Sequence, residues 1–250
     1  MDDDTLTVAP NPHGESIRVM VNVSPYYDLE RSRKGVEQGN HRAMIGGMWD
    51  EIGKLQFDYL KNDGLAPSDR LLDVGCGCLR GGIHFVEYLE VGNYFGIDIS
   101  EDLLNAGYEL EIARLNLQHK LPRENLRTTG DFDATPFGME FDAVLALSVF
   151  THLPINHIRL CLARLEPSVR PGGNFFATVF NITGDGDWTK PAAHTPGGIT
   201  THPDRDPYHY TSADLEFCCH GLNWRLDRLE EWDHPRDQWM AVFIRTASPS

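Results

Sequence analysis

Residues 71–82 read Leu-Leu-Asp-Val-Gly-Cys-Gly-Cys-Leu-Arg-Gly-Gly, and this stretch decides the fold. Its apolar start is typical of a short buried strand, and the glycines that follow are typical of a tight turn before a helix. In an open α/β sheet, such a turn lies at the carboxyl end of a strand, where ligands bind. The stretch therefore predicts a ligand site at the first strand of a parallel sheet.

The size and charge of the chain limit the classes of protein to which it can belong. Its 250 residues suffice for one large α/β domain with its own core. The formal net charge is −15 and the lysines and arginines are scattered, so we expect no nucleic-acid partner. No window approaches the roughly 18 apolar residues of a membrane span, so we expect no membrane contact. An acidic N-terminus and five cysteines without a Cys-x-x-Cys pair favour a cytoplasmic protein.

The sequence on either side of the opening stretch predicts alternating helices and strands. Upstream, apolar residues spaced four, three and four apart from Met48 to Tyr59 indicate one face of a helix over about 47–61. Downstream, four further strands and a closing hairpin are expected. The strands are expected at 94–99, 126–129, 141–147 and 174–180, and the hairpin at 224–232 and 238–245. We predict an α/β fold with a doubly wound, seven-stranded, mostly parallel sheet that has one antiparallel edge strand.

Two segments carry no strong periodic pattern. Residues 1–45 are expected to form an N-terminal arm ahead of a domain over 46–250, and the arm is either a surface cap or a lid over a bound ligand. Within the arm we expect disorder at the start, a strand or extended segment at 17–23, then a short helix and a loop at 39–42. Residues 181–210 are rich in Gly, Pro, Thr, Asp and His, and a long loop is expected there.

The residues around the glycine turn indicate the kind of ligand. Gly75 and Gly77 let the backbone approach a ligand closely, and Asp98 at the end of the second strand can accept from two ribose hydroxyls. The turn is one residue longer than the dinucleotide fingerprint. Asp73, just before it, would repel a pyrophosphate but suits a cationic ligand with an amino group and a sulfonium.

With these features the chain resembles the class I S-adenosylmethionine-dependent methyltransferases. The resemblance covers about residues 45–246, and it is carried by residues 72–77, 94–99, 130–131, 141–144, 148–153 and 168–173. It implies S-adenosylmethionine as the cofactor. It also implies the residues that hold this cofactor. They are Asp73, Gly75 and Gly77 along the methionine, Arg80 and Gly81 at its carboxylate, Leu147 and Ser148 at the sulfonium, Asp98 at the ribose, and Ile99, Asp131 and Phe132 at the adenine.

His152 is the candidate for the base that an alcohol acceptor requires. The pKa of an alcohol is far above 7, so its proton must be taken up during transfer, and a neutral histidine suits that role. His152 follows the fourth strand by a few residues, close to the expected methyl group. The alternative is a histidine that only caps or packs the start of the next helix.

Further side chains are candidates for binding a small-molecule acceptor. Loop histidines are expected on the rim of the sheet, and aromatic and basic residues of the arm would suit a polar ring such as a sugar. The candidates are Tyr26, Tyr27, His41, Arg42, His202, His209 and His234. For each loop histidine the alternative is a solvated side chain. We predict no metal, although these histidines with Asp204 and Asp206 could instead bind a divalent ion.

Two motifs bear on the acceptor. Residues 206–211 and 234–236 look like those of bacterial small-molecule O-methyltransferases, which implies methylation of a hydroxyl on a sugar or natural product. One alternative is a methyltransferase for an amine or a protein side chain, which needs no strong base. Another is a protein that binds S-adenosylmethionine without turnover. The longer glycine turn disfavours a nicotinamide-dependent dehydrogenase.

Overall fold

A computed structural model describes residues 24–184 and 186–247, and its centre is a mixed sheet. Seven strands of the described residues follow one another in the order β3-β2-β1-β4-β5-β10-β9. They are β1 (Leu71–Val74), β2 (Tyr94–Asp98), β3 (Leu126–Thr128), β4 (Phe141–Ala146), β5 (Val169–Asn181), β9 (Trp224–Glu230) and β10 (Trp239–Arg245). Strands β1 to β5 are parallel, and β10 runs antiparallel between β5 and β9. The predicted α/β fold class is confirmed, and the antiparallel strand lies one place in from the edge.

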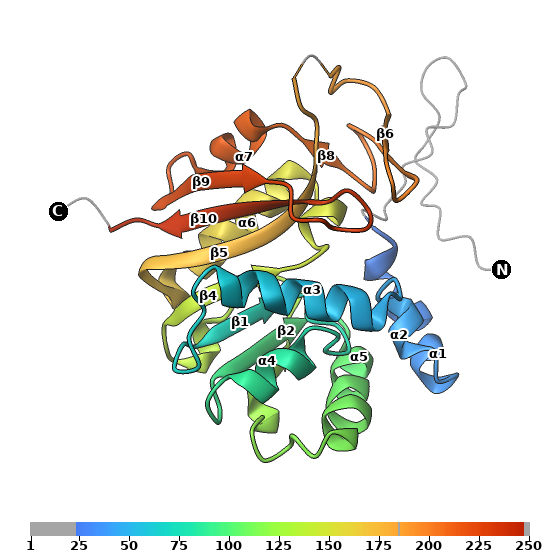
Figure 1. Cartoon of the computed structure of the whole chain (residues 1–250), viewed down its shortest axis with the longest axis vertical. Helices are drawn as coiled ribbons and strands as arrows, with labels where there is room; N and C mark the ends of the chain where they lie inside the picture. The colour runs from blue at the N-terminus through green and yellow to red at the C-terminus, as the bar shows by residue number, and fades with distance from the viewer. Residues whose placement is uncertain (1–23, 185, 248–250) are drawn as a thin grey trace, which may run out of the picture.

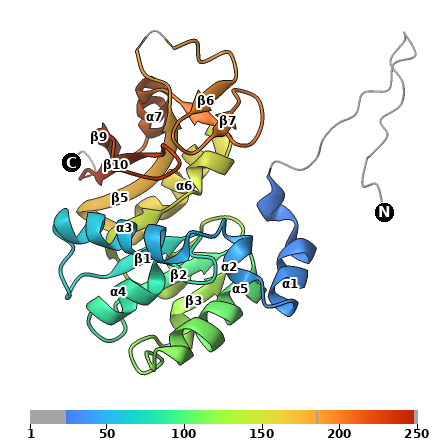
Figure 2. The same cartoon turned by 45° about the vertical axis from the view of Figure 1, so that its right-hand side comes forward.

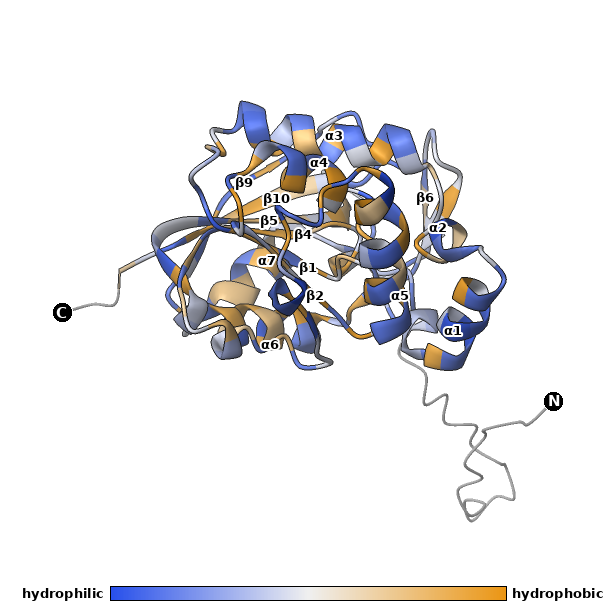
Figure 3. Cartoon of the chain, turned by 90° about the horizontal axis from the view of Figure 1, so that it is seen from below, coloured by the Kyte–Doolittle hydropathy of each residue, from blue (hydrophilic) through white to orange (hydrophobic). Residues whose placement is uncertain are grey.

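Helices cover both faces of this sheet, as Figures 1 and 3 show. On one face lie α3 (Trp49–Asn62), α4 (Gly82–Tyr88) and α5 (Glu101–Ala106), and on the other lie α6 (Ile155–Leu165) and α7 (Ser212–Cys219). The buried side of α3 carries the apolar residues whose spacing predicts it, Ile52 and Leu60 among them. Each face thus has its own apolar core, and the helix predicted over about 47–61 is confirmed.

The helices that lead away from the strand ends begin with polar caps. Ser100, directly after β2, accepts a hydrogen bond from the backbone N–H of Leu103 and starts α5. Thr211 and Asp214 form a reciprocal capping box that starts α7. These caps fix the exit direction of the chain at the carboxyl ends of the strands.

The described part of the arm, residues 24–45, forms short helices beside α5, as Figure 2 shows. They are η1 (Pro25–Tyr27), α1 (Leu29–Glu37) and α2 (His41–Met44). The loop expected at 39–42 is confirmed only for residues 39–40. His41 and Arg42 begin α2 instead, and both bind the buried carboxylate of Glu111. The expectations for residues 1–14 and 17–23 lie outside the described residues.

The segment 181–210 is not the irregular loop that its composition predicts. It contains the hairpin of β6 (Ala192–His194) and β7 (Ile199–Thr201), and β8 (His209–Tyr210) pairs with the end of β5. The two rings of His194 and His209 both hydrogen-bond the Thr201 hydroxyl, at 2.9 and 2.8 Å. Strands of two or three residues are too short to show an alternating hydrophobic pattern in the sequence. The buried polar network at Thr201 holds these strands together instead.

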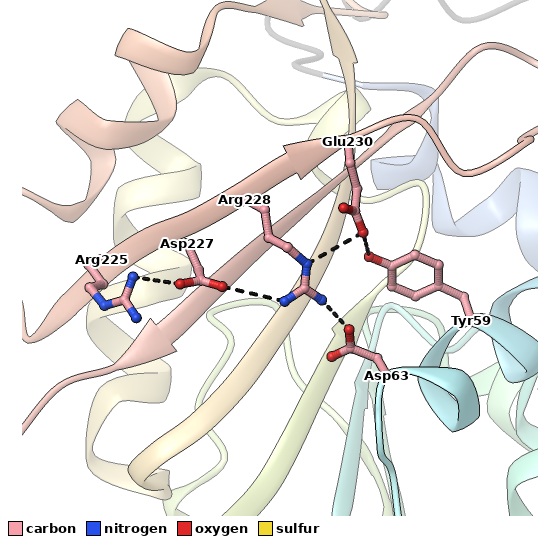
Figure 4. Close-up of polar contacts among 6 residues, drawn as sticks. All are labelled: Tyr59, Asp63, Arg225, Asp227, Arg228 and Glu230. Atoms are coloured by element: carbon pink, nitrogen blue, oxygen red, sulfur yellow. Dashed lines mark hydrogen bonds and ion pairs between the residues drawn. The ribbon is translucent and has the colours of Figure 1, made fainter.

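The edge strand β9 is fixed to α3 by a polar network, shown in Figure 4. Arg228 on β9 pairs with Asp63 at the end of α3 and with its strand neighbours Asp227 and Glu230. The Tyr59 hydroxyl of α3 donates to Glu230. Charged side chains along an exposed edge also discourage pairing with another chain.

Gly53 of α3 provides the first testable prediction, because it lies against the glycine turn. A Cβ at this position would be 2.7 Å from the backbone oxygen of Arg80 and 3.3 Å from Nε2 of His84. Alanine normally stabilises a helix by about 1 kcal/mol over glycine. We expect Gly53→Ala to destabilise the protein instead, by about 1–3 kcal/mol in urea unfolding, because rigid backbone must shift. The exposed control Glu51→Ala should change the stability little, and a Gly53→Ala variant as stable as the wild type would contradict this close packing.

Candidate active site

A cavity lies at the carboxyl ends of β1, β2 and β4, and the N-terminal arm forms part of its wall. The strand order reverses between β1 and β4, which is where open α/β sheets bind ligands. Most of the predicted site residues meet here. Those that line the cavity are Tyr26, Tyr27, Asp73, Gly75, Gly77, Arg80, Gly81, Asp98, Ile99, Phe132, Leu147, Ser148 and His152.

Asp98, at the end of β2, joins two of the turns that line the cavity. Its carboxylate is buried and accepts from the backbone N–H groups of Gly77 and Ser100, both at 2.8 Å. Burial raises the pKa of Asp98, and these hydrogen bonds oppose the rise. Each carboxylate oxygen can accept two hydrogen bonds and accepts one from these backbone groups, so each keeps one free acceptor site. Two neighbouring hydroxyls, as on a ribose, match these sites.

Asp73, on β1, is buried at the bottom of the cavity. The Tyr94 hydroxyl donates to its Oδ2 at 2.7 Å. Burial raises the pKa of Asp73 to about 7, against the effect of this hydrogen bond. The carboxyl group therefore changes its charge near neutral pH, and a ligand ammonium group would favour the charged form.

This raised pKa predicts how stability depends on pH. Between the ordinary aspartate pKa near 4 and the folded value of about 7, the folded protein holds a proton that the unfolded chain has lost. The free energy of unfolding of the ligand-free protein should therefore fall as the pH rises, by about 1 kcal/mol from pH 6 to pH 8. Asp73→Asn should remove this part of the fall in urea unfolding at both pH values. An equal fall in wild type and variant would contradict the assignment.

Gly75 and Gly77 are required by the protein itself. Both have left-handed backbones, with φ of 69° and 54°. A Cβ on Gly75 would be 2.5 Å from Cγ2 of Val149, and one on Gly77 would be 2.7 Å from Cγ2 of Ile45. The sequence reasoning attributed the glycines to close approach of a ligand, whereas the nearest atoms belong to side chains of the cavity wall.

Arg80 connects the glycine turn to the arm. Its guanidinium is buried, and Nη1 donates to the backbone oxygens of Ile45 (3.2 Å) and Gly47 (2.8 Å). Burial and the neighbouring Arg236 lower the pKa of Arg80 to about 10, so it remains a cation at neutral pH. Arg80 thus holds the segment 45–47 against the turn and keeps a positive charge at the cavity wall.

His152, in the short helix η5 (Phe150–His152), is paired with a carboxylate. Its Nδ1 lies 2.5 Å from Oδ1 of Asp206, and the ring of Tyr26 packs on it with centroids 4.6 Å apart. The pairing orients the ring and places the Nδ1 proton toward Asp206, which leaves Nε2 able to accept a proton. The sequence predicts Asp206 as a possible metal ligand and as the start of the motif at 206–211. It does not predict the pairing with His152, since no local pattern links residues 54 positions apart.

Two lining residues have unusual backbones. Phe132 and Ser148 adopt positive φ, at 63° and 54°, although neither is glycine. Such conformations are costly and concentrate at binding and catalytic sites. The backbone N–H of Ser148 donates to Oγ1 of Thr178 at 2.6 Å, which holds this turn after β4 in place.

Two of the predicted acceptor residues, His41 and Arg42, lie outside the cavity lining. Both bind Glu111, whose carboxylate is buried between His41 (2.7 Å), Arg42 (2.6 Å) and Arg114 (3.1 Å). They anchor α2 to the helical segment after α5. In this structure His41 and Arg42 therefore hold the arm in place.

The remaining candidates also lie outside the lining. Both ring nitrogens of His209 are engaged, with the Thr201 hydroxyl and the Trp188 carbonyl oxygen (2.8 Å each). His202 is joined to Pro207 through its backbone, and His234 stacks on Trp232. In a separate turn, the Asp131 carboxylate accepts from the Thr129 hydroxyl at 2.6 Å.

The described residues hold neither a group of metal-binding side chains nor a membrane-spanning helix. Within residues 24–184 and 186–247, no three or more His, Cys, Asp or Glu side chains are grouped so that they could hold a metal ion. No helix in the same ranges is long and apolar enough to cross a membrane.

Sequence comparison finds similarity to methyltransferases. Residues 72–175 match a family described as a methyltransferase domain. The chain is 28% identical over 135 residues to a ubiquinone biosynthesis O-methyltransferase of Nitrosococcus oceani, covering 53% of this chain and 52% of that one. It is 32% identical over 135 residues to the enzyme of that name from Dechloromonas aromatica, covering 52% and 53%. The chain spans about half the length of these curated relatives.

Solved structures share the fold at low identity. A magnesium protoporphyrin IX methyltransferase from Synechocystis, solved with bound SAH, aligns with a TM-score of 0.60 at 17% identity, covering 88% of this chain and all of that one. The CcbJ methyltransferase of Streptomyces caelestis aligns with a TM-score of 0.58 at 16% identity, covering 78% and 90%.

Proposed function

We propose that this chain is a class I S-adenosylmethionine-dependent methyltransferase and that it transfers a methyl group from S-adenosylmethionine to a hydroxyl group of a small molecule. One observation carries the proposal. A single cavity is lined both by Asp73 and Asp98, which suit the donor, and by His152, which is paired with Asp206 and suits a hydroxyl acceptor.

The cavity fits the cofactor in charge and in hydrogen bonding. Asp98 keeps two free acceptor sites for the ribose hydroxyls, and the buried Asp73 has a raised pKa that an ammonium group would lower. Arg80 offers a positive charge for a carboxylate. When bound, the cofactor supplies the methyl group and a good leaving group. The protein's own contribution is then mainly alignment.

The proposed role of His152 is to take up the proton of the hydroxyl. Its Nε2 would accept the proton as the oxygen attacks the methyl carbon, and the carboxylate of Asp206 would stabilise the resulting imidazolium. The proposed acceptor is a small molecule such as a sugar or a natural product, and an O-methyltransferase among the relatives supports methylation of a hydroxyl.

The arm is proposed to be a lid over this site. Ser24, Tyr26 and Tyr27 line the cavity from residues 24–45, and Tyr26 covers the His152 ring. Arg80 and Glu111 anchor the same segment from the domain side. We therefore divide the chain into an arm over 1–45 and a catalytic domain over 46–250.

We also place the protein in the cytoplasm. All five cysteines are free and buried, and burial raises the pKa of each thiol. Disulfides are rare in reducing compartments, so unpaired cysteines are the expected state there.

Two measurements test the proposed function. Calorimetry should show binding of S-adenosylhomocysteine and no binding of NAD. Incubation with S-adenosylmethionine and a panel of sugars, phenols and amines should release S-adenosylhomocysteine with a hydroxyl acceptor. Binding of NAD alone would disprove the methyltransferase assignment, and turnover restricted to amines would disprove the hydroxyl acceptor.

Asp206→Asn tests the pairing with His152. An amide can donate to Nδ1 and so favours the wrong ring tautomer, which moves the proton to Nε2. We expect kcat to fall about tenfold or more, while affinity for S-adenosylhomocysteine stays within about twofold. Asp204→Asn, at an exposed position two residues away, is the matched control. Equal rates in both variants would show that Asp206 does not act through His152.

A further inference from the structure

The turn between β9 and β10 holds a buried histidine that the proposed mechanism does not use. His234 is 5% exposed and stacks on Trp232, with ring centroids 5.3 Å apart. Its Nδ1 accepts from the backbone N–H of Arg236 at 3.2 Å. Burial, Arg236 and Arg80 lower the pKa of His234 to about 3, so the ring is neutral and its single proton is on Nε2. This Nε2 is buried and has no hydrogen-bond partner among the described residues.

Two guanidinium groups lie near this unpartnered donor. Arg236 donates to the backbone oxygen of Gly46 at 2.6 Å, and Arg80 donates to those of Ile45 and Gly47. The two arginines thus bind consecutive carbonyl groups of the segment 45–47, and the backbone N–H of Arg236 binds the His234 ring. Within residues 24–184 and 186–247, neither guanidinium forms an ion pair with a carboxylate. A buried cation at Arg80, a half-buried one at Arg236 and a buried N–H donor without an acceptor point to an anion that the protein does not supply.

The cluster adjoins the proposed acceptor site. Tyr26 packs on His152 and lines the same cavity as Arg80. Ser148, which lines the cavity, donates to Oε1 of Gln238 at 3.0 Å, directly after the turn. Arg80 and His152 thus line one cavity, and the turn that carries His234 and Arg236 is joined to its wall through Gln238 and Ser148.

We propose that His234 and Arg236, beside Arg80, bind an anionic group, a carboxylate or a phosphate, of the acceptor whose hydroxyl lies at His152. This inference rests on the proposed function and names the class of its substrate, a hydroxylated acid. Guanidinium groups form charge-assisted hydrogen bonds with carboxylate and phosphate oxygens, and the Nε2–H of His234 adds a neutral donor. The carboxylate of the cofactor itself is another possible occupant of these residues. The first arm of the experiment distinguishes it from an anionic group of the acceptor.

The first arm uses calorimetry to compare the binding of two nucleosides related to the cofactor, in the wild type and in Arg236→Gln. S-adenosylhomocysteine carries the carboxylate, and methylthioadenosine lacks it. If the cluster binds the acceptor, the variant should bind each of them within about twofold of the wild type. A selective loss of S-adenosylhomocysteine affinity would assign Arg236 to the cofactor and overturn the inference. Failure of the wild type to bind either nucleoside would disprove the proposed function instead.

The second arm titrates acetate and inorganic phosphate into wild-type protein saturated with S-adenosylhomocysteine. We expect saturable binding of at least one anion, weakened tenfold or more in Arg236→Gln and in His234→Phe, since one charge-assisted hydrogen bond is worth about that much. Arg236→Lys, which keeps the charge and supports the fold, should lose less. Arg225→Gln, an arginine of β9 paired with Asp227, is the control. No saturable binding of either anion, or equal binding in all four variants, would overturn the inference.

Discussion

Replacing Asp98 with alanine should weaken the binding of S-adenosylhomocysteine by about 100-fold or more in calorimetry. The carboxylate has two free acceptor sites, and each charge-assisted hydrogen bond to a ribose hydroxyl is worth about 1.5–3 kcal/mol. Alanine also leaves the backbone N–H groups of Gly77 and Ser100 without their acceptor, so the turn that holds the ligand loses its order.

A set of variants separates these two effects. Asp98→Asn keeps an acceptor oxygen of the same shape and should fall between wild type and alanine. Glu101→Ala, at an exposed position of the next helix, should bind with wild-type affinity. If Asp98→Ala folded normally and bound S-adenosylhomocysteine as the wild type does, the ribose would lie elsewhere and the assignment of this strand end would be wrong.

The sheet and the donor side of the site are predictable because their signals are local. Each parallel strand is a short apolar run followed by a polar or glycine-rich turn, as at residues 71–77. Side chains at the carboxyl ends of neighbouring parallel strands meet at one edge of the sheet, so Asp73 and Asp98 converge whatever the loops do. The alternating pattern of the last two strands likewise predicts their hairpin.

The acceptor side depends on contacts between distant residues, which no local pattern reports. Asp206 meets His152 because β8 pairs with the end of β5 and the backbone N–H of Tyr208 donates to the Thr151 oxygen, beside His152. The helix α2 exists because Glu111, about 70 residues away, offers a buried carboxylate to His41 and Arg42. The composition of residues 181–210 predicts a loop, whereas a buried polar network of this kind orders the segment into short strands.

The glycine turn illustrates a residue choice that is predictable without its cause. A Gly-x-Gly pattern after a strand indicates a tight turn, and the left-handed backbones at Gly75 and Gly77 agree with it. The space beside these glycines is occupied by Val149 and Ile45. Their positions depend on how the arm and the turn after β4 pack against the domain. The sequence therefore indicates where the tight turn lies, while the residues that pack around it depend on the tertiary structure.

Replacing His152 with alanine should lower kcat for a hydroxyl acceptor by about 10²–10⁴-fold, the usual contribution of a general base. Affinity for S-adenosylhomocysteine should stay within about twofold, since His152 lies on the acceptor side of the cavity, under Tyr26. Single-turnover release of S-adenosylhomocysteine measures the chemical step directly. The variant also discriminates between acceptors, because an amine attacks as its free base and needs no proton acceptor in the transition state. His152→Gln keeps a polar side chain without a basic nitrogen and should be as slow as alanine. A near wild-type rate with the hydroxyl acceptor in either variant would indicate that His152 only packs the start of α6 and is not the base.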